Sequence, residues 1–277
     1  TPEPVRSALL DGARWWNQAF ETIGYKDAFQ VKVLPDDAHP LDIRYNVINW
    51  VHRSTRGWSY GGSVVDPRTG EIIKGNVLLG SLRVRQDYMI ATGLLAPFSE
   101  QSESEGVLEN LAESPMMDMA LARIRQLSAH EVGHTLGIYH NFASSANNQA
   151  SVMDYPHPRV DIIDGELNLG DAYDTAIGDW DKVTIAYGYQ DFPDDMDEIK
   201  ALNEILEQAH SSGLDYISDN DARPQGGSHP TAHLWDYGQD PTDQLGHILE
   251  VRDIALKQFG MANIPSGRPT SYLEDVL

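Results

Sequence analysis

The stretch that most constrains this chain is residues 130–140, which read HEVGHTLGIYH. His130 and His134 stand four positions apart, so on a helix both imidazoles lie on one face, one turn above the other. A catalytic zinc typically takes three protein ligands and leaves its fourth position to water. Gly137 can adopt the left-handed backbone that ends a helix, and the chain can then turn to bring His140 to the metal. The run therefore predicts a zinc site built from a helix and the turn after it.

Glu131 follows the first candidate ligand on the same helical turn, so its carboxylate can reach a water at the metal without binding the metal. Zinc lowers the pKa of such a water towards neutrality. A nearby carboxylate can take its proton during attack on a carbonyl and pass it to the leaving amine. A structural zinc usually has a fourth Cys or His ligand, and this chain has no cysteine. A catalytic site with Glu131 as general base is therefore favoured over a structural zinc. The presence of Glu131, Gly137 and His140 together also favours it over ordinary histidines on an amphipathic helix.

Residues 130–140 resemble the metzincin clan of zinc endopeptidases, whose signature is H-E-x-x-H-x-x-G-x-x-H followed by a Met-turn. By this resemblance, Met153 forms a hydrophobic floor beneath one catalytic Zn²⁺ without binding it, and the substrate is a peptide or protein. The resemblance implies an α+β, zincin-like fold in a single catalytic domain over residues 1–277. A mixed, twisted sheet and the active-site helix would form an upper lobe, about residues 1–137. A mainly helical lower lobe would follow, about residues 138–277.

Residues 151–155 are similar to the S-x-M-x-Y turn of the astacin and serralysin branches. The tyrosine of those branches reaches the metal or the developing oxyanion, so the resemblance makes Tyr155 a candidate for transition-state stabilisation. A buried structural tyrosine is the alternative. His157 lies just beyond and could face the cleft.

The residue after the third histidine helps to distinguish metzincin branches, and Asn141 matches none of the best-known ones. The chain most resembles an uncharacterised bacterial Met-zincin domain family. That similarity extends to three less specific outer motifs, at residues 15–17, 66–71 and 178–182.

Two other functions remain open at this point. A zinc hydrolase could act on a non-peptide amide, such as one in a cell-wall polymer, because activated water attacks any suitably held carbonyl. A non-catalytic binding module could also keep a peptidase fold, although degenerate zincins usually lose the glutamate or a ligand.

The chain has 20 basic and 42 acidic residues and a net charge of −22. Nucleic acid is not an expected partner, because phosphate binding needs clusters of Lys and Arg. The charge modestly favours basic or neutral substrates, and no apolar run is long enough for a membrane span. The chain starts without Met, so we expect a mature part of a longer protein that could contain additional domains. Peptidases of the clan that the chain resembles are commonly secreted, so we expect a secreted, periplasmic or cell-envelope location.

Many of the acidic residues fall between positions 191 and 221, which predicts a solvated helical face. A Ca²⁺ site is an alternative, although the stretch lacks the EF-hand spacing of glycine and glutamate. Its candidate ligands are Asp215, Asp219, Asn220 and Asp221.

Hydrophobic periodicity and turn residues predict the elements of both halves. Before the motif we expect a helix over 2–23 capped by Thr1, strands at 29–34 and 43–52, a hairpin of 63–65 and 71–73, a strand over 76–84 and an acidic connection over 101–113. Ser114 and Pro115 should then start the metal-bearing helix. Later we expect a hairpin of 160–163 and 166–169 and helices at about 178–188, 194–210 and 241–259. Metzincins bind the substrate along an edge strand, for which residues 76–80 are the candidate, although an internal strand there is about equally expected.

Overall fold

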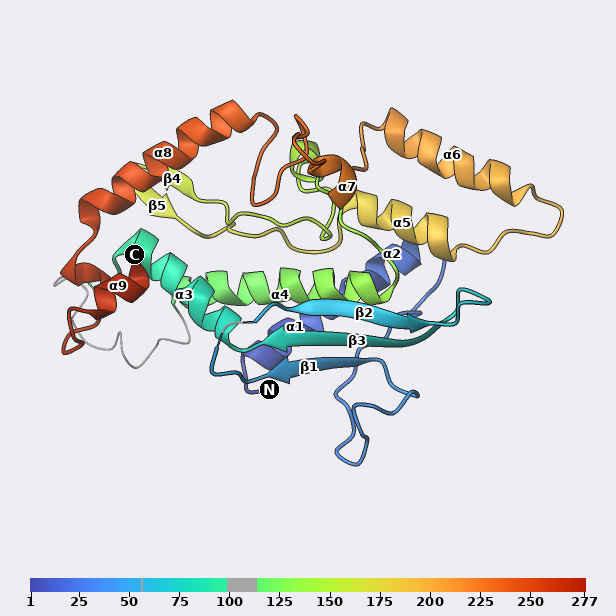
Figure 1. Ribbon diagram of the computed structural model, residues 1–277, viewed down its shortest axis with the longest axis horizontal. Coiled ribbons are helices and arrows are strands. Elements are labelled where there is room, and N and C mark those ends of the chain that lie inside the picture. Colours follow the sequence, from blue (N-terminus) through green and yellow to red (C-terminus); the bar gives the residue numbers. More distant parts are fainter. Residues whose placement is uncertain (56, 99–113) are drawn as a thin grey trace.

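A long helix, α4 (Pro115–Thr135), runs through the middle of the structure and carries the first two candidate ligands (Figure 1). The computed structural model describes residues 1–55, 57–98 and 114–277. The hydroxyl of Ser114 accepts a hydrogen bond from the backbone N–H of Met117, and a proline occupies the first turn. The predicted start of this helix is therefore confirmed. The acidic connection expected over 101–113 lies outside the described residues.

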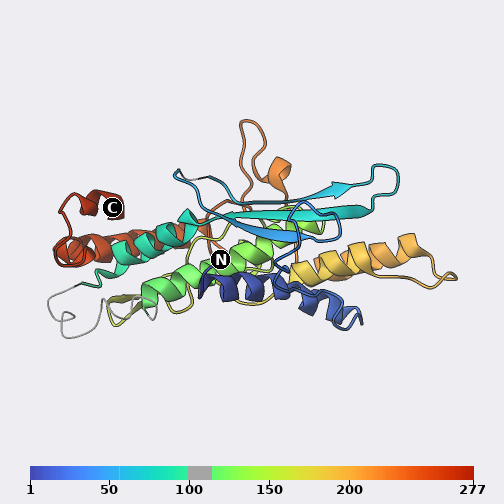
Figure 2. The same cartoon turned by 90° about the horizontal axis from the view of Figure 1, so that it is seen from below.

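Helix α4 is buried along most of its length because other elements cover several of its sides. Helices α1 (Val5–Arg14) and α3 (Leu82–Leu95) pack along it, and strands β2 (Tyr60–Val65) and β3 (Ile72–Gly80) lie across its C-terminal part. Figure 2 shows α4 between α1 and the sheet. The metal-bearing helix is thus held rigidly from both sides.

The core below α4 is organised by Trp16, which is fully buried. Its indole N–H donates a 2.8 Å hydrogen bond to the carbonyl oxygen of Ala129, one residue before the first candidate ligand. Ile124, Val132 and Met153 belong to the same apolar cluster. The outer motif at residues 15–17 therefore supports the helix directly beneath the histidines.

The sheet has the order β1-β3-β2, with β1 spanning Val47–Val51. Strand β1 pairs in parallel with β3, and β2 pairs antiparallel with β3, so the sheet is mixed as predicted. The predicted hairpin is confirmed, because β2 and β3 flank the turn at residues 66–70. Together with the helices, this confirms the α+β fold class.

Of the two alternatives for residues 76–80, the internal strand is confirmed and the edge strand is wrong, because β3 is the central strand of the sheet. Leu78 pairs with Asn49 on one side and with Tyr60 on the other. The sequence did not reveal this position, because it depends on β1 arriving in parallel after a long crossover. Strand β2, which has one paired neighbour among the described strands, is the edge beside α4.

The predicted strand over 76–84 is also too long, since β3 ends at Gly80 and helix α3 follows. The alternation of apolar and charged residues at the start of α3 imitates a strand. In the structure, Arg83 and Asp87 form an ion pair across one helical turn, with an N–O distance of 2.7 Å. Such a pair stabilises a helix and not a strand.

Two predictions near the N-terminus also needed correction. The expected helix over 2–23 is two helices, α1 and α2 (Trp16–Thr22), which meet at Trp15; α1 begins at Val5, so Thr1 does not cap it. No strand forms over 29–34. Val33 is exposed there, so its side chain does not pack against the core as the side chain of a half-buried strand would.

After α4, the chain forms mostly helices on the side of α4 opposite the sheet (Figure 1). The predicted hairpin and three helices are confirmed within a few residues, as β4 (Asp161–Ile163), β5 (Glu166–Asn168), α5 (Asp179–Tyr189), α6 (Glu198–Ser211) and α8 (Pro241–Gln258). Two short helices were not predicted, α7 (Asp219–Ala222) and α9 (Tyr272–Val276). Helix α9 packs against α3, so the C-terminal end returns to the first half. No described helix is long and apolar enough to cross a membrane.

Strand β2 approaches α4 very closely at Gly61, where a Cβ atom would lie 1.8 Å from the carbonyl oxygen of Glu131. We expect Gly61→Ala to lower the free energy of unfolding by about 1–3 kcal/mol, because the methyl group pushes β2 off the helix. Denaturant titration measures this loss.

The neighbouring Gly62 provides the matched control, because a Cβ atom there has nothing within 4 Å. Gly62→Ala should therefore be neutral or slightly stabilising. Equal stability of the two variants would contradict a tight contact between β2 and α4.

Candidate metal centre

The structure brings His130, His134 and His140 together, although the third lies beyond the end of α4. One ring nitrogen from each lies within 4.8 Å of the others. The Nε2 atoms of His134 and His140 are 3.2 Å apart. Two nitrogen ligands at about 2.0–2.1 Å from a tetrahedral zinc lie roughly 3.3 Å apart. The donor set and this spacing therefore fit a zinc ion.

The Nδ1 atom of each imidazole faces away from this centre and meets an oxygen acceptor. His130 Nδ1 lies 2.8 Å from the Val152 carbonyl oxygen, and His134 Nδ1 lies 2.9 Å from the Ile138 carbonyl oxygen. His140 Nδ1 lies 2.8 Å from a carboxylate oxygen, Oδ2 of Asp219. Such partners favour the tautomer with the proton on Nδ1 and leave Nε2 free to bind metal.

The turn after α4 follows from Gly137, as predicted, whose φ of 84° lies in the left-handed region. The Ile138 backbone N–H then donates to the Gly133 carbonyl oxygen at 3.2 Å. This closure returns the Ile138 carbonyl to the ring of His134 and starts the path towards His140. The glycine therefore determines both the helix end and one imidazole orientation.

The electrostatic surroundings favour the neutral form of two of the imidazoles. Burial lowers the pKa of His130 well below its ordinary value, and the other two histidines lower it further. Burial also lowers the pKa of His134, against a hydrogen bond to Ile138. Because a metal binds neutral imidazole, these shifts reduce competition from protons.

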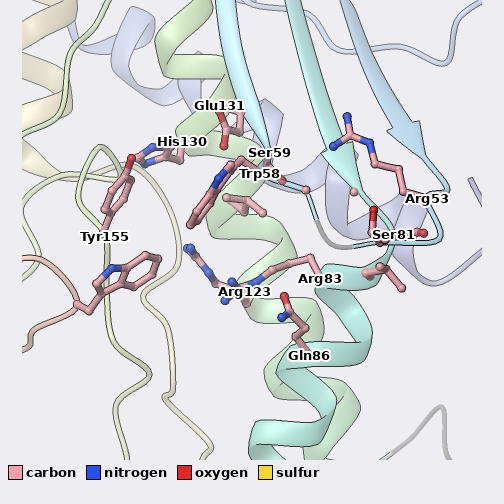
Figure 3. Close-up of a pocket in the computed structure, with 16 residues that line it drawn as sticks. Arg53, Trp58, Ser59, Ser81, Arg83, Gln86, Arg123, His130, Glu131 and Tyr155 are labelled. Carbon is pink, nitrogen blue, oxygen red and sulfur yellow. The ribbon is translucent and has the colours of Figure 1, made fainter. Parts of the chain in front are cut away.

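Glu131 is almost completely buried beside the first histidine. Burial raises the pKa of its carboxyl group to about 7, against a hydrogen bond from the Gly61 backbone N–H and the positive charge of Arg123. Glu131, His130 and Tyr155 line the same pocket, as Figure 3 shows. A carboxylate with a pKa near the working pH in such a pocket is suited to proton transfer.

Met153 is fully buried under α4, where its sulfur atom would lie 2.3 Å from a Cβ atom on Gly133. The turn around it is held by Asp181, which is also fully buried. The Asp181 carboxylate accepts hydrogen bonds from the Ser151 hydroxyl at 2.6 Å and from the backbone N–H groups of Val152 and Gly178 at 2.9 and 2.8 Å. The outer motif at residues 178–182 thus fixes the turn whose carbonyl meets His130.

Residues 112–277 match the family model described as Met-zincin. This chain belongs to the Met-zincin family. The match covers the histidine motif, the Met-turn and every element that follows. Searches of curated proteins and of solved structures found no match. The family and the histidine group together indicate a metallopeptidase-type protein with a zinc site.

The ring of Tyr155 in this Met-zincin domain lies beside the histidines, with its centroid 4.6 Å from that of His140 and 5.5 Å from that of His130. It stacks on Trp235 at 5.1 Å. His157, in contrast, is not among the described residues that line the pocket, and its Nδ1 atom lies 2.7 Å from the Pro158 carbonyl oxygen. The structure therefore brings Tyr155 to the site and leaves His157 outside it.

Two further residues shape the site without an obvious sequence signal. Asn141 is buried, and its side chain accepts a hydrogen bond from the Ile217 backbone N–H at 3.1 Å and donates one to the Asp215 carbonyl oxygen at 2.9 Å. These two hydrogen bonds hold residues 215–217 against Asn141, and the same segment then leads to Asp219, which contacts His140. The unusual residue after the third histidine is the one available clue, since nothing local marks Asp219.

The Ca²⁺ site proposed from Asp215, Asp219, Asn220 and Asp221 is not supported. Asp219 instead contacts His140. Among the residues that the structure describes, no carboxylate cluster gathers as a metal-binding group, and the three histidines do.

We expect Asp219→Ala to weaken zinc binding by about 10–100-fold, because the third imidazole loses the acceptor that orients it. Asp219→Asn should fall between this variant and the wild type, since an amide oxygen still accepts the hydrogen bond. Zinc affinity is measured by competition with a chelating dye.

The matched control is Asp221→Asn, which removes an exposed carboxylate from the same short helix. Its affinity for zinc should stay at the wild-type value. A similar loss in both variants would indicate a general charge effect and contradict orientation by Asp219.

A second buried carboxyl group, Asp154, supports the Met-turn from the other side. Burial and the nearby Asp236 raise its pKa to about 8, and burial also raises the pKa of Asp236. Ser145 lies between them, donating its backbone N–H to Asp154 at 3.1 Å and its hydroxyl to Asp236 at 2.9 Å. Two such neighbouring carboxyl groups do not readily ionise together.

Because the folded state raises this pKa, the folded chain binds more protons than the unfolded chain between about pH 4 and about pH 8. The stability from Asp154 is therefore full at the acid end of this window and is lost as the pH rises through it. We expect Asp154→Asn to gain stability relative to the wild type over this window. Unfolding midpoints of metal-free protein test this, because metal binding adds its own pH dependence. A difference that stays constant with pH would contradict it.

Proposed function

We propose that this chain is a zinc-dependent endopeptidase in which His130, His134 and His140 hold the metal and Glu131 is the general base. The observation that supports it best is that three imidazoles meet with their Nε2 atoms facing one another. The buried carboxylate of Glu131 lies beside them and lines a pocket. Zinc held there supplies Lewis acidity, which polarises a carbonyl group and makes water more acidic.

The residues of the chain supply proton transfer and positioning in this proposal. Glu131 accepts the proton of the attacking water and returns it to the amine nitrogen that leaves. Tyr155 lies beside the histidines and can donate its hydroxyl proton in a hydrogen bond to the carbonyl oxygen as that oxygen gains negative charge. Met153 packs beneath the motif helix and keeps the floor of the site apolar.

An extended peptide can bind along β2, which replaces residues 76–80 as the candidate edge strand. Gly57, Trp58 and Ser59, just before β2, line the pocket with Glu131. Adding a strand here would place the substrate backbone over the C-terminal part of α4. We propose this edge as the docking site of the scissile segment.

Glu131→Gln should leave zinc stoichiometry unchanged and lower the turnover of peptides by about 10²–10⁴-fold, because the amide cannot accept the proton of water. Glu250→Gln, on the exposed side of α8, is the control and should retain full activity. Zinc content by mass spectrometry and cleavage of a diverse peptide library are measured on the same preparations.

Peptide cleavage that survives Glu131→Gln would contradict the proposed base. Intact peptides together with hydrolysis of a cell-wall amide by the zinc-loaded wild type would replace the endopeptidase with the non-peptide hydrolase. No hydrolysis of either substrate by zinc-loaded protein would favour the binding module.

A further inference from the structure

The pocket beside Glu131 gathers positive charge in a chain whose net charge is −22. Arg53, Arg83 and Arg123 all line it, and Glu131 is the one acidic residue among the described lining residues. In Figure 3 the side chains of Arg83 and Arg123 lie close together, coming from α3 and α4 respectively, with Glu131 at the other end of the pocket. The local charge is therefore opposite to that of the whole chain.

Arg123 is the unusual member of this group because its side chain is only 3% exposed. Its guanidinium donates to the side-chain oxygen of Gln126 and lies over the ring of Tyr173 at 5.5 Å. Its Nε atom is buried with no hydrogen-bond partner. The carboxylates of Asp87 and Glu131 act on its charge only through space, because neither forms an ion pair or a hydrogen bond with it. Burial still outweighs these two charges and lowers the pKa of Arg123. A buried guanidinium without a directly bound anion is costly, so an anion that enters the pocket would stabilise it.

Arg83 does not compensate for this deficit, because its own charge is already paired. Its guanidinium binds the fully buried Asp87 with two hydrogen bonds, of 2.9 and 2.7 Å. That pairing fixes the position of Arg83 beside Arg123. Gln86, on the same helix, adds an amide group to the pocket lining. The two guanidinium groups and the amide form a preorganised set of donors.

The position of this set relative to the metal centre follows from helix geometry. Arg123 stands two turns before His130 on the same face of α4, which corresponds to a rise of about 10 Å. An extended peptide advances about 3.3 Å per residue. A group two or three residues away from the scissile bond can therefore reach Arg123.

We propose that Arg123, supported by Arg83, binds a carboxylate of the substrate two or three residues from the bond that is cut. The carboxylate belongs either to an acidic side chain or to the free C-terminus of the peptide. This inference rests on the proposed peptidase function and names its substrate class. It also reverses the expectation of basic or neutral substrates from net charge, because the local charge in the pocket acts on the substrate at short range.

The first test compares short peptides that differ only by Glu or Gln at each position around one scissile bond, each with a free or an amidated C-terminus. At one position the Glu peptide, or the peptide with the free C-terminus, should have a kcat/KM about tenfold or more above its neutral counterpart. A gain from Glu alone assigns the site to a side chain, and a gain from the free terminus alone assigns it to the C-terminal carboxylate. Equal values for every pair would overturn the inference.

The second test uses Arg123→Gln, which should reduce the preference for the carboxylate peptide to about one. The matched control is Arg85→Gln on α3, because Arg85 is exposed and binds Asp275 outside the pocket. This control should keep the wild-type preference. A purely structural role of Arg123 would lower turnover of both peptides equally and leave their ratio unchanged, which would also overturn the inference.

A binding measurement separates this inference from the proposed function and needs no change at Arg123. Zinc-loaded Glu131→Gln protein is titrated calorimetrically with the carboxylate peptide and with its neutral counterpart. Tighter binding of the carboxylate peptide supports the inference even if the wild type cleaves nothing, a result that would contradict only the peptidase function. Equal affinities would overturn the inference even if the wild type cleaves both peptides.

Discussion

The three hydrogen bonds at the Nδ1 atoms of the histidines determine which way the imidazoles face. Their acceptors come from three separate parts of the chain: the Met-turn, the turn that ends α4, and helix α7. Each acceptor is held by further contacts, such as those of Asp181 and Asn141. The metal centre therefore depends on elements from both sides of α4. After the Met-turn, Asp181 and Asp219 are the residues that serve this purpose, one by holding the turn and one by contacting His140 directly.

The elements that pack around α4 also bury two groups of opposite charge along the pocket, Glu131 and Arg123. Glu131 is pressed against β2 at Gly61, where burial raises its pKa to about 7. Two turns earlier on the same helix, Arg123 is equally buried and has no directly bound carboxylate among the described residues. A group that handles protons and a group that attracts anions therefore share one rigid helix. Their separation is fixed before substrate arrives, which reduces the entropic cost of binding.

The parts of the structure that the sequence predicted are those determined by local spacing. In residues 130–140 the helix, its glycine end and the meeting of three histidines all follow from positions a few residues apart. Strand order was not predictable in this way, since the central position of β3 depends on the distant strand β1. Asp219 was also missed in its actual role. Its acidic neighbours resemble a solvated face or a Ca²⁺ site, and only the folded chain brings it to His140.

The most direct test of the central claim is X-ray absorption spectroscopy at the zinc edge on protein loaded with one equivalent of zinc. The account predicts three imidazole nitrogens at about 2.0–2.1 Å from the metal, with the outer-shell scattering pattern of histidine rings. Loss of one ring from the fit in a His140→Ala variant would assign the third ligand. A zinc shell with fewer than three imidazoles in the wild-type protein, or one dominated by carboxylate oxygens, would contradict the account.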